Sequence, residues 1–200
     1  LPLSAQVSGS IDMDGTEIVG ASDQAIADLR GRYVGMVFQN PSAALNPVMT
    51  VAQQVALPLR LHYDLTRDER LDRVKAMFAK VRLPEDVLNK YPHELSGGQQ
   101  QRVGIARAFV TKPEVVFADE PTGNLDSKTK TEVMTMICAF AHDFNQTIVL
   151  VTHDPQMASY ADRIVTLLDG RITSDRLNTD LSRPTVPSTP SAQRTQGVDR

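Results

Sequence analysis

Three short and almost wholly apolar runs constrain the fold of this chain more than any other feature. They occupy residues 34–38, 115–118 and 147–151, and a polar residue follows each one directly. Apolar runs of this length are typical of strands buried on both faces, as in a parallel sheet. Between the second and third runs, Val133 and Ile137 recur at helical spacing. The pattern predicts an α/β fold with a mostly parallel sheet that is covered on both faces.

Changes of composition divide the chain into four expected segments. Residues 1–40 form part of a core, with a strand-turn-strand pattern around Gly15 before the first apolar run. Residues 41–95 change to helix and loop, and residues 96–180 return to α/β alternation. Residues 181–200 are rich in Pro, Ser, Thr, Gln and Arg and have almost nothing to bury. We expect a disordered tail there.

Local signals place a helix inside the second segment and a hairpin in the third. Thr66 and Glu69 form a capping box, and Leu71 and Phe78 then recur at helical spacing. A strand pair is predicted to turn at Gly170.

Composition excludes several classes of function. The formal net charge of −3 offers no general attraction to nucleic acid or anionic lipid. A single cysteine, Cys138, cannot form an internal disulfide or a cysteine-based metal site, which fits a reducing compartment. No apolar run reaches the roughly 18–20 residues that span a bilayer. We therefore expect no DNA or RNA partner and no membrane crossing by this chain itself.

Two carboxylates, Asp119 and Glu120, close the second apolar run. Ligand sites in open α/β sheets lie at the carboxyl ends of the strands. One carboxylate there can hold Mg²⁺ while its neighbour polarises an attacking water. Taken alone, such a pair more often marks a strand that simply ends in solvated acids.

A loop of Ser96, Gly97 and Gly98 precedes a predicted helix. Glycines let the backbone approach an anion, and the helix directs its positive end at it, although a plain loop with a serine cap has the same sequence. His153 follows the third apolar run and Gln39 ends the first. Either residue on its own is more often structural than catalytic.

In their order and spacing these pieces resemble the ATP-binding cassette ATPases, the motor subunits of ABC transporters. The resemblance extends over about residues 8–175 and implies a P-loop NTPase-like core with an inserted helical subdomain at 41–95. The matching motifs are the Q-loop at Gln39, the signature at 95–99, Walker B at 115–120, the D-loop at 124–126 and the switch histidine at His153.

The resemblance also implies the role of each residue. Asp119 and Gln39 would help to hold Mg²⁺, and Glu120 would be the base that orients water on the γ-phosphate of ATP. His153 would contact that phosphate. Gln39 would in addition couple the site to the membrane partner.

Family members work as head-to-tail pairs. Ser96, Gly97, Gly98 and Gln99 would therefore bind the nucleotide held by a second ATP-binding subunit, and Asp126 would act across the same interface. The implied partners are that subunit and the transmembrane permease subunits, so the chain would lie peripherally on the cytoplasmic side of the cell membrane.

One family motif is absent from the sequence. None of the eleven glycines is followed by lysine, so there is no Gly-x-x-x-x-Gly-Lys-Ser/Thr phosphate loop. Gly15 and Gly20 have the right spacing, but Ala21 and Ser22 follow where lysine and a hydroxyl are required. Residues 7–11 look like the strand that comes just after the phosphate-loop helix in relatives. We expect this chain not to hydrolyse ATP by itself and to expose apolar surface.

Two explanations for this departure stay open. The chain begins with Leu1, which favours an N-terminally truncated form of an ordinary transporter ATPase. The other explanation is a degenerate regulatory subunit that lends Ser96 to Gln99 to a phosphate loop on its partner. Because Glu120 and His153 are intact, we favour truncation.

The sequence distinguishes less clearly between transport and the other functions of cassette ATPases, and between possible cargoes. Cassette ATPases also serve in DNA repair, chromosome handling and translation, but this chain has no cysteine set for zinc, long coiled-coil insertion or basic patch. Residues 45–51 and 91–94 resemble oligopeptide and nickel importer ATPases. Residues 119–126 instead resemble the lipoprotein-release and macrolide-export group, so both import and export remain open.

Overall fold

The computed structural model describes residues 7–13 and 15–179, so the tail expected at 181–200 lies outside the described residues. The strands are β1 (Asp12–Met13), β2 (Thr16–Glu17), β3 (Val34–Val37), β4 (Val115–Asp119), β5 (Thr147–Val151), β6 (Arg163–Leu168) and β7 (Arg171–Leu177). The α-helices are α1 (Asp23–Leu29), α2 (Pro41–Ala44), α3 (Val51–His62), α4 (Arg67–Lys80), α5 (Gly97–Phe109), α6 (Ser127–Phe144) and α7 (Pro155–Ala158). Two short 3₁₀ helices, η1 (Glu85–Asn89) and η2 (Pro92–Glu94), precede α5.

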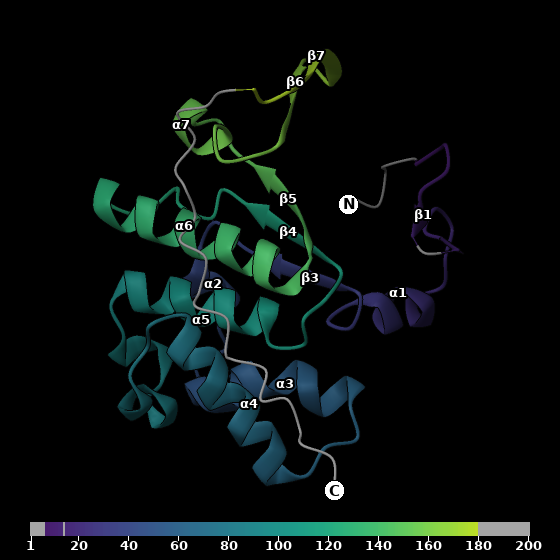
Figure 1. Cartoon of the computed structure of the whole chain (residues 1–200). Coiled ribbons are helices and arrows are strands. Elements are labelled where there is room, and N and C mark those ends of the chain that lie inside the picture. The colour runs from purple at the N-terminus through teal and green to yellow at the C-terminus, as the bar shows by residue number, and fades with distance from the viewer. Residues whose placement is uncertain (1–6, 14, 180–200) are drawn as a thin grey trace, which may run out of the picture.

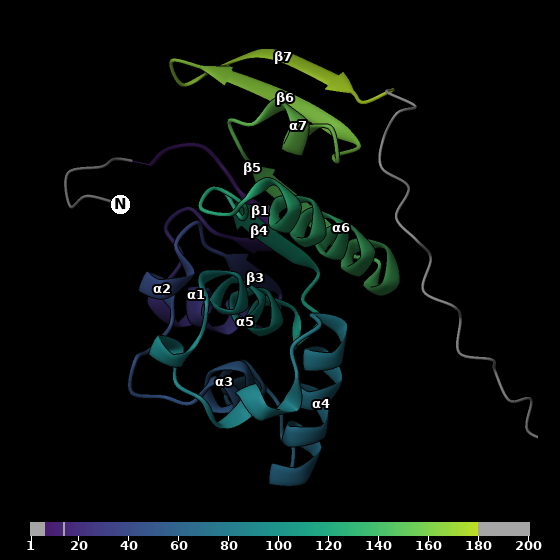
Figure 2. The same ribbon diagram turned by 90° about the vertical axis from the view of Figure 1, so that its left-hand side faces the viewer.

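The three apolar runs form one parallel sheet, as predicted, and the structure gives the strand order β3-β4-β5. Two hairpins, β1-β2 and β6-β7, pair antiparallel and make separate two-stranded sheets. Figures 1 and 2 show β6-β7 standing apart from the parallel sheet, with α7 between them. Because all three central strands run the same way, their carboxyl ends meet at one edge.

One face of this sheet carries the core. Val116 and Ala118 of β4 are fully buried and belong to one apolar cluster with Phe109 of α5 and Ile137 of α6. Figures 1 and 2 place α5 and α6 alongside the sheet. The apolar stripes of these helices therefore cover alternate residues of the strands.

The other face of the sheet is open, and the expectation of cover on both faces is wrong. Met36, Phe117 and Val149 lie side by side in the strand register and remain 37–42% exposed. Phe38 and Val151 are exposed to a similar or greater degree. The almost wholly apolar composition of the strands is typical of burial on both faces. Among the described residues, however, helices cover only one face. This open apolar face agrees with the exposed apolar surface expected from the sequence.

The segment before α5 consists of helices and connecting loops, and residues 41–96 contain no strand. Thr66 and Glu69 form the predicted capping box of α4, and a second box caps α3. Val74 and Phe78 are buried as the helical spacing indicates, whereas Leu71 is 39% exposed because it lies at the edge of the buried stripe. The boundaries of the expected subdomain at 41–95 stay a prediction.

The described residues before β3, 7–13 and 15–33, differ most from expectation. Residues 7–11 form no strand, although the Ile11 carbonyl accepts a backbone hydrogen bond from Ile18. The polar stretch before β3 contains helix α1, which the periodicity did not reveal. Its signal is Ser22, whose hydroxyl accepts a hydrogen bond from the Ala25 amide as an N-cap.

The contrast between the two faces yields a stability prediction. Phe109 is fully buried and its ring lies 4.9 Å from that of Phe140. Phe109→Ala is expected to lower the free energy of unfolding by about 3–5 kcal/mol, because it leaves a cavity. Phe117→Ala, on the open face, is expected to cost less than half as much. Urea denaturation measures both, and equal losses would contradict the assignment of the core.

Candidate functional site

Glu120 stands at the carboxyl end of β4 in a strained backbone conformation. Its φ is 42°, a left-handed value that is uncommon for a residue other than glycine. Its own amide donates to the carbonyl of Val151 on β5, 2.9 Å away. Strain of this kind persists where the surroundings hold it in place, and it is frequent at functional sites.

The Glu120 carboxylate is held by the residues that follow β5. Oε1 accepts the backbone N–H of His153 at 2.7 Å and lies 2.6 Å from the Nδ1 atom of its ring. Oε2 accepts the hydroxyl of Thr152 at 3.1 Å. The Glu120 side chain is only 14% exposed, whereas the His153 ring is 85% exposed. The structure thus brings two predicted site residues together at the edge of the sheet.

Hydrogen bonding outweighs burial in setting the charge of Glu120. Burial raises the pKa of this carboxyl. The hydrogen bonds from the ring and amide of His153 and from Thr152 together lower the pKa by more than burial raises it, so that it lies below its usual value. Glu120 is therefore an anion at neutral pH. An ionised carboxylate can accept a proton or orient a water.

Asp119 points toward the open face of the sheet. It pairs in register with Val151 and alternates with the buried Ala118, so its exposed side chain lies on the same face as Phe117. No group of three or more His, Cys, Asp or Glu within residues 7–13 and 15–179 could hold a metal ion. Mg²⁺ bound with a nucleotide commonly takes one or two protein carboxylates and completes its shell with phosphates and water. Asp119 fits that requirement.

Gln39 lies beside the turn that follows Glu120. Its backbone carbonyl accepts from the Asn124 side-chain amide at 3.4 Å. A Cβ on Gly123 would stand 3.3 Å from the Gln39 amide nitrogen, and the Gly123 N–H donates to the Glu120 carbonyl at 3.0 Å. The Gln39 side chain thus lies close to the turn that contains Glu120 and Gly123.

The signature loop and the D-loop each begin a helix. Ser96 and Gln99 form a capping box at the start of α5, which is the plain structural alternative that the sequence also allowed. Asp126 caps α6, and the bond from the Thr129 hydroxyl at 2.6 Å is the largest influence that lowers the pKa of its carboxyl. A Cβ on Gly98 would meet the Thr129 methyl at 3.7 Å, so the two helix starts adjoin.

The signature does not join the carboxylate cluster within one chain. The side-chain hydrogen bonds of Ser96 and Gln99 stay inside the first turn of α5. Gly97 meets no other atom within 4 Å of where a Cβ would stand, so this turn faces open space.

Sequence reasoning missed two contacts of the site. Thr152 bonds Glu120, and its position directly before His153 was the only available signal. Gln101 is 2% exposed and its side chain donates to the carbonyl of Pro121 at 2.6 Å. Its helical spacing with Ile105 on the buried side of α5 was the signal for Gln101.

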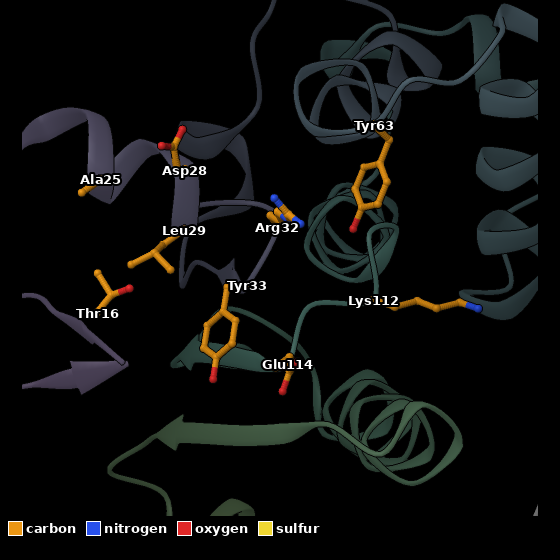
Figure 3. Close-up of a pocket in the computed structure, with 9 residues that line it drawn as sticks. All are labelled: Thr16, Ala25, Asp28, Leu29, Arg32, Tyr33, Tyr63, Lys112 and Glu114. Atoms are coloured by element: carbon orange, nitrogen blue, oxygen red, sulfur yellow. The ribbon is translucent and has the colours of Figure 1, made fainter. Parts of the chain in front are cut away.

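A cavity of about 580 Å³ lies at the opposite edge of the sheet. It opens where β3 and β4 begin, next to Tyr33 and Glu114, and includes Arg32 (Figure 3). Lys112 also borders it, but its ammonium group lies over the ring of Phe144, 5.3 Å from the centroid. The residues predicted to carry the chemistry line none of this cavity.

The three parallel strands β3, β4 and β5 thus place Glu120, Thr152 and His153 together at one edge of the sheet. The chain belongs to the ABC transporter family, whose model matches residues 2–123. It is 36% identical over 191 residues to the bacitracin export ATP-binding protein BceA of Halalkalibacterium halodurans, covering 96% of this chain and 73% of that protein. It is also 36% identical to the oligopeptide transport ATP-binding protein OppD of Lactococcus lactis subsp. cremoris, covering 86% of this chain. The chain spans about half, 52%, of the length of OppD.

Solved structures agree with this family. The dimeric post-hydrolysis state of the ATP-binding cassette MJ0796 bound to ADP and Pi superposes with a TM-score of 0.79 at 34% identity, covering 86% of this chain and 75% of that one. CbiO1 from Clostridium perfringens, part of the transporter complex cbiONQ, gives 0.74 at 31% identity, covering 86% and 66%. Within the described part of the chain, no helix has the length and apolar character to cross a membrane.

Proposed function

We propose that this chain belongs to the ATP-binding and ATP-hydrolysing subunit of an ABC transporter, and that without the phosphate loop it is inactive on its own. The observation that carries the proposal is the Glu120–His153 pair at the carboxyl edge of the sheet, 2.6 Å apart. Phosphoryl transfer to water requires positioning and charge stabilisation more than covalent chemistry. The partly buried Glu120 carboxylate can position a water, and the exposed His153 imidazole beside it can stabilise developing charge.

Each residue at this edge has a defined task in the proposal. Glu120 orients a water and accepts its proton, and His153 turns its exposed ring toward the γ-phosphate. Asp119 and Gln39 would hold Mg²⁺, which supplies positive charge against the phosphates when it is bound. Glu120, His153 and Asp119 fit the γ-phosphate end of a bound MgATP. The sequence offers no Gly-Lys motif to hold the other phosphates.

A second ATP-binding subunit completes the site in this proposal. Ser96 and Gly97 are exposed at the start of α5 and Gly98 follows them, which suits a nucleotide bound by another subunit in a head-to-tail dimer. Asp126, at the adjoining start of α6, would meet the same interface. The dimeric structure of the transporter cassette MJ0796 supports the formation of a dimer.

Nucleotide-driven closure of the dimer would be passed to a membrane permease through Gln39 and the helices that follow it. The chain would then lie peripherally on the cytoplasmic side of the membrane, and the permease would choose the cargo. The names of the relatives include both export and import proteins, so the family supports transport in general. The absent phosphate loop also favours a second candidate, a degenerate subunit that completes the site of its partner.

Purification with its partners tests the proposal. The chain is tagged, expressed in its source organism and extracted from membranes with mild detergent. A permease with several membrane spans and a second ATP-binding subunit should copurify with it. The reconstituted complex should hydrolyse ATP, and Ser96→Arg should abolish that activity by blocking the phosphate approach. Purification with ribosomes or DNA and without a permease would overturn the transport assignment.

A further inference from the structure

A buried amide joins the signature helix to the turn that carries Glu120. Gln101 lies on α5, five residues beyond Ser96, and is 2% exposed. Its Nε2 atom donates to the carbonyl oxygen of Pro121, at 2.6 Å. Pro121 is itself buried and directly follows Glu120. A buried carbonyl requires a partner, and among the described residues Gln101 provides it.

The turn at Glu120 depends on such outside support. Its left-handed φ of 42° is unfavourable for a side chain with a Cβ. Two backbone bonds hold it, from the Glu120 amide to Val151 and from the Gly123 amide to the Glu120 carbonyl. The bond from Gln101 adds a tie from this turn to helix α5.

We propose that Gln101 is a positioning residue, which fixes the Glu120 turn to helix α5 and so makes the placement of the carboxylate follow the placement of the signature loop. Ser96 and Gln101 lie about 7.5 Å apart along one helix, at 1.5 Å of rise per residue. A short helix moves as a rigid body, so a shift of its first turn reaches Pro121. The inference rests on the proposed function, in which the first turn meets the partner's nucleotide.

The test compares two buried glutamines in the full chain. Gln101→Met keeps the volume and removes the donor. Gln54→Met is the matched control, because Gln54 is also 2% exposed and donates to the backbone carbonyls of Asn46 and Met49, at 3.0 and 2.9 Å. Amide hydrogen exchange and chemical shifts, measured by NMR, report on the Glu120 turn without requiring turnover.

We expect Gln101→Met to speed exchange of the Gly123 amide about tenfold and to shift the amide resonance of His153, whose N–H donates to Glu120. Gln54→Met should change neither. In a complex whose cassette carries a complete phosphate loop beside Glu120, Gln101→Met should lower kcat and leave the KM for ATP unchanged. Gln101→Asn, whose amide is one methylene too short, should reproduce these effects if the Met variant does not fold.

The inference is overturned if the Gly123 and His153 signals are the same in Gln101→Met and the wild type, or if both Met variants change them equally. A complex that never hydrolyses ATP, with the NMR changes as expected, would instead count against the proposed function alone.

Discussion

Replacement of Glu120 by glutamine is expected to lower kcat for ATP hydrolysis by about 10²–10⁴-fold in the cassette with a complete phosphate loop. Glutamine keeps the shape of the side chain and can still contact Thr152 and His153, but it cannot accept a proton from water. ATP binding should persist, so the nucleotide-bound dimer should accumulate. Steady-state hydrolysis and size-exclusion chromatography with ATP measure the two effects.

Glu114→Gln is the matched control for this experiment. Glu114 precedes β4 at the opposite end of the same strand and is exposed. Its replacement should leave both hydrolysis and dimerisation unchanged. If Glu120→Gln kept full turnover, Glu120 would not be the base, whatever its contacts with His153.

The second large effect concerns the 200-residue chain by itself. Hydrogen bonds to charged groups contribute about 1.5–3 kcal/mol each. Three phosphate contacts missing with the Gly-Lys loop would therefore cost about 4.5–9 kcal/mol, or roughly three to six decades of affinity. We expect titration calorimetry to find no tight ATP binding and hydrolysis assays to find no turnover from the purified chain.

The complementary experiment restores the missing phosphate loop and measures ATP binding again. A longer form that carries Gly-x-x-x-x-Gly-Lys-Ser/Thr upstream of residue 1, or a partner subunit that provides it, should restore binding. A turnover near 1 s⁻¹ from the purified 200 residues, free of contaminating ATPases, would contradict the importance given to this loop.

The open face of the sheet bears on both experiments. Asp119 shares that face with Phe117 and Met36, all of them exposed. Exposed apolar side chains that lie together are more stable when another element or chain covers them than when they stay in water. In both experiments the oligomeric state of each variant should therefore be measured and should match that of the unsubstituted chain.

The sequence alone predicted the parts of the fold that local rules govern. Each of the three central strands was marked by an apolar run, and the cap of α4 by Thr66 and Glu69. Such signals act over a few residues and do not depend on what packs nearby. Helix α1 escaped because its seven residues include no fully buried one, so no apolar stripe marked it.

The order of the motifs was likewise enough to identify the family, because residue types and spacings are properties of the chain itself. Only the tertiary structure decided which of those residues meet. Glu120 and His153 are 33 positions apart and touch because β4 and β5 pair in parallel and end at one edge. Gln101 reaches Pro121 because α5 packs back along the sheet. Contacts between distant residues depend on strand register and helix packing, which the whole chain sets together, and no short pattern encodes them.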